Sequence, residues 1–349
     1  MKIHEIYMKR ALELGRRGTI LAHPNPSVGC VIVHQNRIIG EGFTSSFGKD
    51  HAEINALNSV KSVDKVFLPD STLYVTLEPC SHYGKTPPCA IRIAEEQPAA
   101  VIIGCKDPNP KVSGKGVNIL KKAGIHVQVG VLQDQCLYHH RVFLKGIQTQ
   151  TPYVTLKWAE SADGFIAPLP KQEGEEKIFW LSNSWSQQHA HLLRAKHAAI
   201  LIGTETLKKD RPTLTTRHVS GPSPKPFVLT RDYRNIQETD NAYNVIEVCD
   251  EKRTHHFLND EPSHFIQATS IKEALDKLYS MGYTSVLVEG GFQVIQSFIE
   301  EDLWDEIICF KSPNELKAGI KSPIPPQLER LSKSNKDEIF GLRRSSLHP

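Results

Sequence analysis

Four side chains in the first half of the sequence form a pattern suited to zinc chemistry. His51 opens the segment HAEINAL, and Glu53 follows it by two residues. Cys80 and Cys89 lie in EPCSHYGKTPPCA at 78–90. One imidazole and two thiolates are a donor set that zinc prefers, and three protein ligands leave the fourth position for water, as in catalytic sites. The sequence therefore predicts His51, Cys80 and Cys89 as ligands of one zinc ion per chain.

Glu53 is the predicted proton-transfer group. Zinc-dependent nucleobase deaminases combine a His-x-Glu motif with a later cysteine pair, and their glutamate acts as general acid and base without binding the metal. Here eight residues, not two, separate the cysteines. Two alternatives stay open from the residues alone. Each cysteine could be a small buried hydrophobe, or His82 could complete a purely structural zinc site in which Glu53 has no function.

Helix and strand signals alternate around these residues. We expect a helix at 4–17, a hairpin of strands at 28–33 and 37–43, a helix at 51–60, a strand at 71–78, a helix at 89–96 and a strand at 99–105. Because helices separate the apolar runs, part of the sheet should be parallel and covered on both faces. His51 and Cys89 then begin helices, where backbone amides favour a thiolate.

A second α/β pattern starts after a boundary that we place near 147–151. Its expected elements are strands at 152–159, 198–204 and 284–290 and a helix at 271–282. VLVEGGFQVIQSF is a strand, a glycine turn and a helix, an arrangement that can bind phosphate although it lacks the GxGxxG spacing. The charged stretch 168–177 is either a loop over a cofactor site or a solvated hairpin, and we favour the hairpin. From KSPIPPQ onward the chain carries little secondary-structure signal.

Composition limits the classes of protein to consider. The 349 residues correspond to about two domains. A net charge of +3 and an aromatic content of 7% give no footprint for nucleic acid. Seven cysteines, an odd number in a long chain, argue against a disulfide framework. Neither a signal segment nor an apolar run of membrane-spanning length is present, so we expect a cytoplasmic protein without a membrane partner.

The first half resembles the deaminase domain of the bifunctional riboflavin-biosynthesis deaminase/reductases. The resemblance rests on PNPSVGCVIV (24–33), HAE (51–53), EPCSHYGKTPPC (78–89) and DPNPKVSGKG (107–116). The long spacing between the cysteines belongs to this family's pattern. The resemblance implies a cytidine-deaminase-like, three-layer α/β/α domain. It also implies that Asn25 contacts the pyrimidine and that the segment Lys106–Lys115 contacts the ribose phosphate.

The second half resembles the reductase domain of the same family, which implies a dihydrofolate-reductase-like α/β domain. The matching segments are PYVTLKWAESADGFIA (152–167), IFWLSNSW (178–185), the run 191–217 and VLVEGG (286–291). Two positions depart from the family pattern. Ala162 stands where the family has Leu, and Arg211 stands where it has Asp or Asn. The implied domains are residues 1–147 for the deaminase and 148–349 for the reductase.

The resemblance also implies site residues in the second domain. Those for NADPH are Ala159, Trp180, Thr206, Asp210, Gly291, Phe292, Gln293, Val294, Ile295, Gln296 and Ser297. Those for the substrate are Arg194, Leu214, Arg217 and Glu289. Asp210 is in addition the candidate for proton handling or orientation at the acceptor carbon, and Lys157 could orient either group.

The implied function is a two-step conversion of small phosphoribosylaminopyrimidines. Zinc-dependent hydrolysis removes an amino group from 2,5-diamino-6-(5-phosphoribosylamino)pyrimidin-4(3H)-one, and NADPH then reduces the ribosyl group to a ribityl chain. The resemblance further implies a homo-oligomer formed through the reductase domain. Two other hypotheses are a nucleic-acid deaminase with an appended binding module and a zinc-stabilised scaffold with a degenerate reductase domain.

Overall fold

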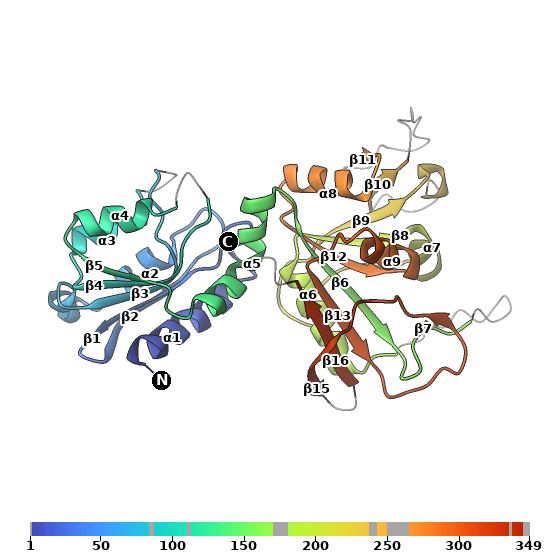
Figure 1. The fold of residues 1–349 in the computed structure, drawn as a ribbon, viewed down its shortest axis with the longest axis horizontal. Coiled ribbons are helices and arrows are strands. Elements are labelled where there is room, and N and C mark those ends of the chain that lie inside the picture. The colour runs from blue at the N-terminus through green and yellow to red at the C-terminus, as the bar shows by residue number, and fades with distance from the viewer. Residues whose placement is uncertain are drawn as a thin grey trace. The chain divides into compact units, whose positions relative to one another are not determined.

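The chain forms two compact units, Met1–Thr149 and Gln150–Pro349. The computed structural model describes residues 2–83, 87–109, 113–169, 181–236, 243–249, 265–334 and 337–344. Helix α5 (Gln133–Thr149) continues through the predicted boundary at 147–148 and ends where the first unit ends. Figure 1 labels the elements of each unit.

A five-stranded sheet with the strand order β2-β1-β3-β4-β5 forms the centre of the first unit (Figure 1). Its strands are β1 (Gly29–His34), β2 (Arg37–Phe43), β3 (Thr72–Leu77), β4 (Ala100–Cys105) and β5 (His126–Val129). β1 pairs antiparallel with β2 and β3, whereas β3, β4 and β5 are parallel. The predicted hairpin and the predicted parallel part of the sheet are both present.

Helices cover both faces of this sheet. α1 contacts α5, and α3 contacts both α2 and α4. Figure 1 shows α3 and α4 on the side of the sheet opposite α1. The first unit therefore has the predicted three-layer α/β/α arrangement. The remaining bounds are α1 (Ile3–Gly18), α2 (Ala52–Ser59), α3 (Cys89–Glu96), α4 (Lys115–Lys122) and a short 3-10 helix at Ser62–Phe67.

The central strands of the first unit are apolar because both of their faces are covered. Val31, Val75 and Ile103, one from each of β1, β3 and β4, are completely buried. α1 lies so close to the start of β1 that a Cβ atom at Gly29 would be 1.8 Å from the carbonyl oxygen of Ala11. Only glycine fits there. The close contact fixes the position of the chain immediately after the segment that carries Asn25.

The second unit contains a nine-stranded sheet with the order β11-β10-β9-β8-β12-β6-β13-β16-β15 (Figure 1). The strands from β11 to β13 are parallel, and β16 and β15 continue the sheet antiparallel. The bounds are β6 (Tyr153–Glu160), β8 (Ala199–Gly203), β9 (Lys225–Thr230), β10 (Asn244–Val248), β11 (Phe265–Ala268), β12 (Ser285–Gly290), β13 (Glu306–Lys311), β15 (Glu329–Ser334) and β16 (Asp337–Arg343).

Smaller elements complete the second unit. β7 and β14 form a separate two-stranded sheet. The bounds are β7 (Phe165–Ala167), β14 (Ile320–Lys321), α6 (Ser184–Lys196), α7 (Thr204–Asp210), α8 (Ile271–Ser280), α9 (Phe292–Glu300) and a short 3-10 helix at Tyr233–Ile236. The predicted elements at 152–159, 198–204, 271–282 and 284–290 all occur with small shifts at their ends.

The C-terminal region corrects one expectation. The sequence after residue 320 carries little signal, yet β15 and β16 extend the main sheet there. β16 alternates buried and partly exposed residues: Asp337 and Ile339 are buried, whereas Phe340 and Leu342 are partly exposed. The predicted hairpin at 168–177 lies mostly outside the described residues, since only 168 and 169 are described.

Candidate functional site

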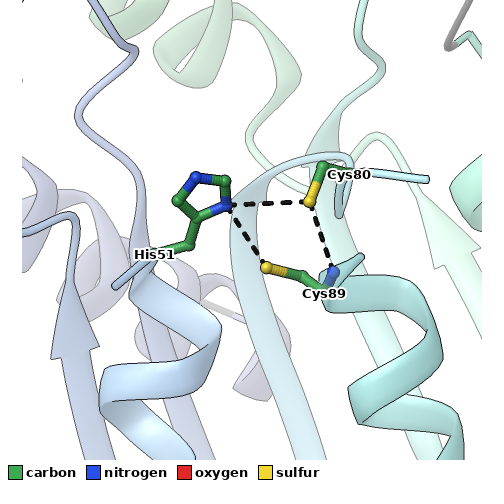
Figure 2. Close-up of side chains that lie close together, drawn as sticks. All are labelled: His51, Cys80 and Cys89. Carbon is green, nitrogen blue, oxygen red and sulfur yellow. Dashed lines mark hydrogen bonds between the residues drawn. The ribbon is translucent and has the colours of Figure 1, made fainter. Parts of the chain in front are cut away.

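The three predicted metal ligands meet at one point in the first unit. His51 is the N-cap residue of α2, Cys89 is the first residue of α3, and Cys80 lies in the loop after β3. Nδ1 of His51 is 3.7 Å from Sγ of Cys80 and 3.3 Å from Sγ of Cys89 (Figure 2). All three ligand atoms lie within 4.8 Å of one another.

This spacing fits a zinc ion. Zn–S bonds of about 2.3 Å and Zn–N bonds of about 2.0–2.1 Å in tetrahedral geometry place sulfur and nitrogen about 3.6 Å apart. The observed separations of 3.3 and 3.7 Å lie on either side of that value. His82, the alternative fourth ligand, is exposed and does not belong to the group that the described residues form. The three protein ligands therefore leave one position for water.

Glu53 lies in the first turn of α2, two residues after His51, and its side chain is buried. Burial, together with the neighbouring Cys80, raises the pKa of the Glu53 carboxyl to about 7, although His51 acts in the opposite direction. The hydrogen bonds with Cys89 and His51 lower the pKa of the Cys80 thiol, so Cys80 favours the thiolate that binds metal.

Three chain segments converge at the edge of the sheet where β3 ends. Cys105 at the end of β4 pairs with Leu77 at the end of β3, so the loop beginning at Lys106 leaves the sheet beside the loop that carries Cys80. At the start of β1, Gly29 donates its N–H to Oγ1 of Thr76 on β3, 3.1 Å away. The segment that carries the half-buried Asn25 thus enters at the same edge.

One cavity of about 1520 Å³ lies in the second unit. It opens at the carboxyl ends of the parallel strands, where ligands of open α/β sheets bind. Most predicted cofactor and substrate residues line it: Ala159, Thr206, Asp210, Gly291, Phe292, Gln293, Val294, Ile295, Ser297, Arg194, Leu214, Arg217 and Glu289. Lys157 lines it as well.

Two predicted residues are not among those that line the cavity. Trp180 lies outside the described residues. The side chain of Gln296 donates to Oε1 of Glu300 and accepts the N–H of Ile324, which directs it away from the cavity.

Several lining residues could not be recognised from the sequence motifs. Most of them lie at or directly after the ends of β8, β9 and β11, and one lies in α7: Thr204, Thr230, Arg231, Thr269 and Ser270, with Lys208 in α7. Their positions after strands were a usable signal, because the carboxyl ends of parallel strands share one edge.

Two positions around the start of α9 require glycine, one because of its backbone conformation and one because of close packing. Gly290 has φ of +126°, a conformation that favours glycine. Gly203, at the end of β8, faces α9, and a Cβ atom there would be 2.7 Å from a methyl group of Val294. The first turn of α9 therefore lies directly against the end of β8, with its backbone amides at the cavity.

Arg194 and Glu289 form a bidentate ion pair. Nε and Nη2 of Arg194 donate to the two carboxylate oxygens of Glu289 at 2.9 and 2.8 Å. Nζ of Lys157 lies 4.0 Å from the same carboxylate. Burial alone would raise the pKa of Glu289, but Lys157 and Arg194 outweigh it and lower the pKa to about 2. Two of the four substrate residues predicted for this domain, Arg194 and Glu289, thus lie side by side at the cavity. Together with Lys157 they form what we call the charged wall of the cavity.

We predict that Glu289→Gln destabilises the second unit at neutral pH and that the difference from the wild type shrinks in acid. Since the folded-state pKa of about 2 lies below the ordinary 4.5, the contribution is complete above pH 4.5 and is lost as the pH falls toward 2. The shift corresponds to roughly 3 kcal/mol. All four tryptophans belong to the second unit, so their fluorescence during urea unfolding reports on that unit. A difference that stays constant between about pH 6 and about pH 3 would contradict the assignment.

The two departures from the family pattern lie in different surroundings. Ala162 is exposed, is not among the residues that line the cavity, and donates its backbone N–H to Asn314. Arg211 lines the cavity and ends α7 with φ of +39°. Asn and Asp tolerate this left-handed conformation better than arginine does, which explains the family's preference at this position.

We predict that Arg211→Asn raises the free energy of unfolding of the second unit by about 0.5–1 kcal/mol, because asparagine adopts the left-handed conformation at lower cost. Thermal unfolding followed by tryptophan fluorescence measures the effect. Arg211→Ala is the matched control, since it removes the same side chain but keeps the backbone cost. Equal stability of the two variants would contradict the explanation.

Comparison with known proteins identifies the family. The "Cytidine and deoxycytidylate deaminase zinc-binding region" family matches residues 1–105, and the "RibD C-terminal domain" family matches residues 152–330. The riboflavin biosynthesis protein RibD of Aquifex aeolicus is 35% identical over 327 residues, which cover 91% of this chain and 89% of that protein. This chain belongs to the RibD family.

Solved RibD structures share the whole architecture. Acinetobacter baumannii RibD is 32% identical with a TM-score of 0.84, over 97% of this chain and 98% of that one. A Thermotoga maritima protein, described as a diaminohydroxyphosphoribosylaminopyrimidine deaminase/5-amino-6-(5-phosphoribosylamino)uracil reductase, is 33% identical with a TM-score of 0.82, over the same shares of the two chains. These matches confirm the predicted family and the predicted pair of α/β domains.

RibD proteins join a zinc-dependent deaminase to an NADPH-dependent reductase. The chain is therefore a bifunctional enzyme of riboflavin biosynthesis, a hydrolase and an oxidoreductase, and its substrates are small molecules. None of the helices in the described part of the chain is both long and apolar enough to cross a lipid bilayer.

Proposed function

We propose that the first unit hydrolyses an amino group from 2,5-diamino-6-(5-phosphoribosylamino)pyrimidin-4(3H)-one and that the second unit reduces the ribosyl group of the product to a ribityl chain. The Thermotoga maritima relative is named for a deaminase and a reductase of such pyrimidines, which supports these substrates. The observation that carries the proposal is the meeting of three ligand atoms within 4.8 Å of one another, with the buried Glu53 two residues from one of them.

In the deaminase reaction, Glu53 moves the protons. A bound zinc ion lowers the pKa of water so that a nucleophile is available near neutral pH. Glu53 accepts a proton from the attacking water and passes it to a ring nitrogen. It then takes the proton of the newly added hydroxyl group and delivers it to the amino group, which leaves as ammonia. Its place in the first turn of α2 keeps its carboxyl close to the ligand group without making it a ligand. Asn25 contacts the pyrimidine, and the segment beginning at Lys106 contacts the ribose phosphate.

In the reductase reaction, the chain aligns cofactor and acceptor in the cavity of the second unit. NADPH supplies the hydride. The backbone amides of the first turn of α9 hold the diphosphate. Ala159 and Thr206 line the nicotinamide and the ribose. Asp210, whose pKa is raised by burial, orients the acceptor or handles its proton.

The charged wall of the cavity receives the substrate. Because the guanidinium of Arg194 already pairs with Glu289, the substrate contacts the two side chains together. Arg217 is exposed, and its backbone N–H donates to Nδ1 of His191 at 3.0 Å. Guanidinium groups bind phosphate bidentately, which suits Arg217 for the substrate phosphate.

We place the deaminase in residues 1–147 and the reductase in residues 148–349, and we propose a homo-oligomer formed through the reductase domain. A cytoplasmic location agrees with the cysteines, since all seven are free thiols. Sedimentation of the full chain and of the separate second domain tests the assembly. A full chain that sediments as a monomer would overturn that part of the proposal.

Mass spectrometry of the products tests the substrate assignment. With the diaminopyrimidine alone, we expect exchange of one amino group for oxygen. After addition of NADPH, the product should gain two hydrogens on its sugar chain. Recovery of the unchanged diaminopyrimidine from the zinc-loaded protein would refute the assignment.

A further inference from the structure

Glu78 connects the two loops that flank the candidate deaminase site. It follows β3 by one residue and precedes the metal ligand Cys80 by two. Its own backbone N–H donates to the carbonyl oxygen of Cys105, at the end of β4, at 2.9 Å. Glu78 therefore lies where the loops after two neighbouring parallel strands leave the sheet.

The Glu78 carboxylate accepts two backbone N–H groups from the loop after β4 and one from the first turn of α4. Oε2 accepts from Asp107 at 3.4 Å and from Gly114 at 3.1 Å, and Oε1 accepts from Val117 at 3.2 Å. The side chain is 4% exposed. The contacts span the segment on both sides of residues 110–112 and include the N-terminal end of α4, where a negative charge is stabilising.

Close backbone packing reinforces this connection. A Cβ atom at Gly116 would lie 2.1 Å from the carbonyl oxygen of Pro79, which directly precedes Cys80. The same atom would lie 3.3 Å from Oε1 of Glu78. The start of α4 thus rests directly on the loop that carries the metal ligand, and Glu78 fills the space beside it.

We infer that Glu78 is a positioning residue for deamination, which holds residues 106–109 and 113–117 beside the metal-binding loop so that Lys106 and Lys115 meet the substrate phosphate. The inference rests on the proposed function. Lys106 and Lys115 are both exposed at the two ends of this segment, while the amides near them point inward to Glu78. The carboxylate therefore fixes the backbone and leaves the cationic side chains facing solvent.

Glu78→Gln is the test variant. Glutamine keeps the size of the side chain, but it replaces one acceptor oxygen with an NH₂ group that cannot accept a hydrogen bond. We expect the KM for the phosphorylated pyrimidine to rise about tenfold or more, with kcat within about threefold of the wild type, as for loss of a binding interaction. Zinc content should stay at one per chain, and reductase turnover should not change.

A merely structural role would give a different result. If Glu78 only stabilised the fold, the variant would contain a smaller fraction of molecules with a folded first unit. The measured kcat would then fall, while KM would stay unchanged. Asp64→Asn is the matched control, because it removes a buried carboxylate that pairs with Arg37 near the other edge of the same sheet. If Glu78→Gln behaves like this control, with an unchanged KM, the inference is wrong.

Two further measurements on Glu78→Gln test the phosphate assignment and the contact separately. With the dephosphorylated pyrimidine, the difference in KM between wild type and Glu78→Gln should vanish, and an undiminished difference would contradict the phosphate assignment. Hydrogen exchange of the Gly114 and Val117 amides should become faster in the variant, and unchanged protection would refute the contact.

If Glu78→Gln does not retain zinc, Gly116→Ala is the second test variant, because its added methyl group strains the contact between α4 and the metal-binding loop. This variant should also raise the KM for the phosphorylated pyrimidine. An unchanged KM would overturn the inference. Failure of the wild type to deaminate the pyrimidine would instead count against the proposed function itself.

Discussion

Replacing Glu53 with glutamine is expected to lower the rate of ammonia release by about 10²–10⁴-fold, the contribution that a positioned general acid and base makes. Glutamine has nearly the same shape but can neither accept the proton of water nor return it to the leaving group. Because Glu53 does not belong to the ligand group, zinc content should remain at one per chain. Reductase turnover, which belongs to the other unit, should be unchanged.

Glu41→Gln is the control for this prediction. Glu41 is a carboxylate of the same unit that pairs with Arg10 and lies on β2. This variant should deaminate at close to the wild-type rate. Deamination that persists at the wild-type rate in Glu53→Gln, with zinc bound, would show that another group moves the protons.

Replacing Cys89 with serine is expected to abolish zinc binding and, with it, deamination down to background. A serine hydroxyl is a poor ligand at neutral pH, and His51 and Cys80 alone cannot complete the site. NADPH oxidation with the deaminated pyrimidine should continue at the wild-type rate, because the cavity is lined by residues of the second unit alone. Metal analysis and two separate activity assays measure the three quantities.

Cys136→Ser is the matched control for the metal ligand. It also removes a buried thiol from the first unit, but Cys136 does not belong to the ligand group. This variant should keep its zinc. Zinc retained by Cys89→Ser, or reductase activity lost together with the metal, would contradict the assignment of separate sites to the two units.

The metal ligands could be predicted from the sequence because residue type and local position suffice for them. His51 and Cys89 begin helices, as the polar and proline-rich segments before them indicated, and Cys80 follows a strand whose apolar run is easily recognised. Each ligand lies within two or three residues of an element's end, so small errors in the bounds did not matter. The convergence of these three ends was implied by the family resemblance.

Contacts that depend on long-range register could not be predicted in the same way. The Arg194–Glu289 pair joins residues 95 positions apart, and only the order of the parallel strands brings them together. From its position on a helix alone, Arg194 would be a solvated surface charge, and only the family resemblance assigned the two residues to the substrate. The role of Glu78 was hidden for the same reason, since its three partners are backbone amides of another loop and of the helix that follows it. β16 was missed because its sequence, DEIFGLR, does not alternate polar and apolar residues.

The most direct test of the two-step account follows ammonia and NADPH together in one reaction of the purified, zinc-loaded protein with the diaminopyrimidine. The account predicts that ammonia appears first and that one NADPH is then oxidised for each ammonia released. It also predicts that Glu53→Gln stops both signals, whereas addition of the deaminated pyrimidine restores NADPH oxidation alone. NADPH oxidation without any release of ammonia, or ammonia release that is never followed by NADPH oxidation, would contradict it.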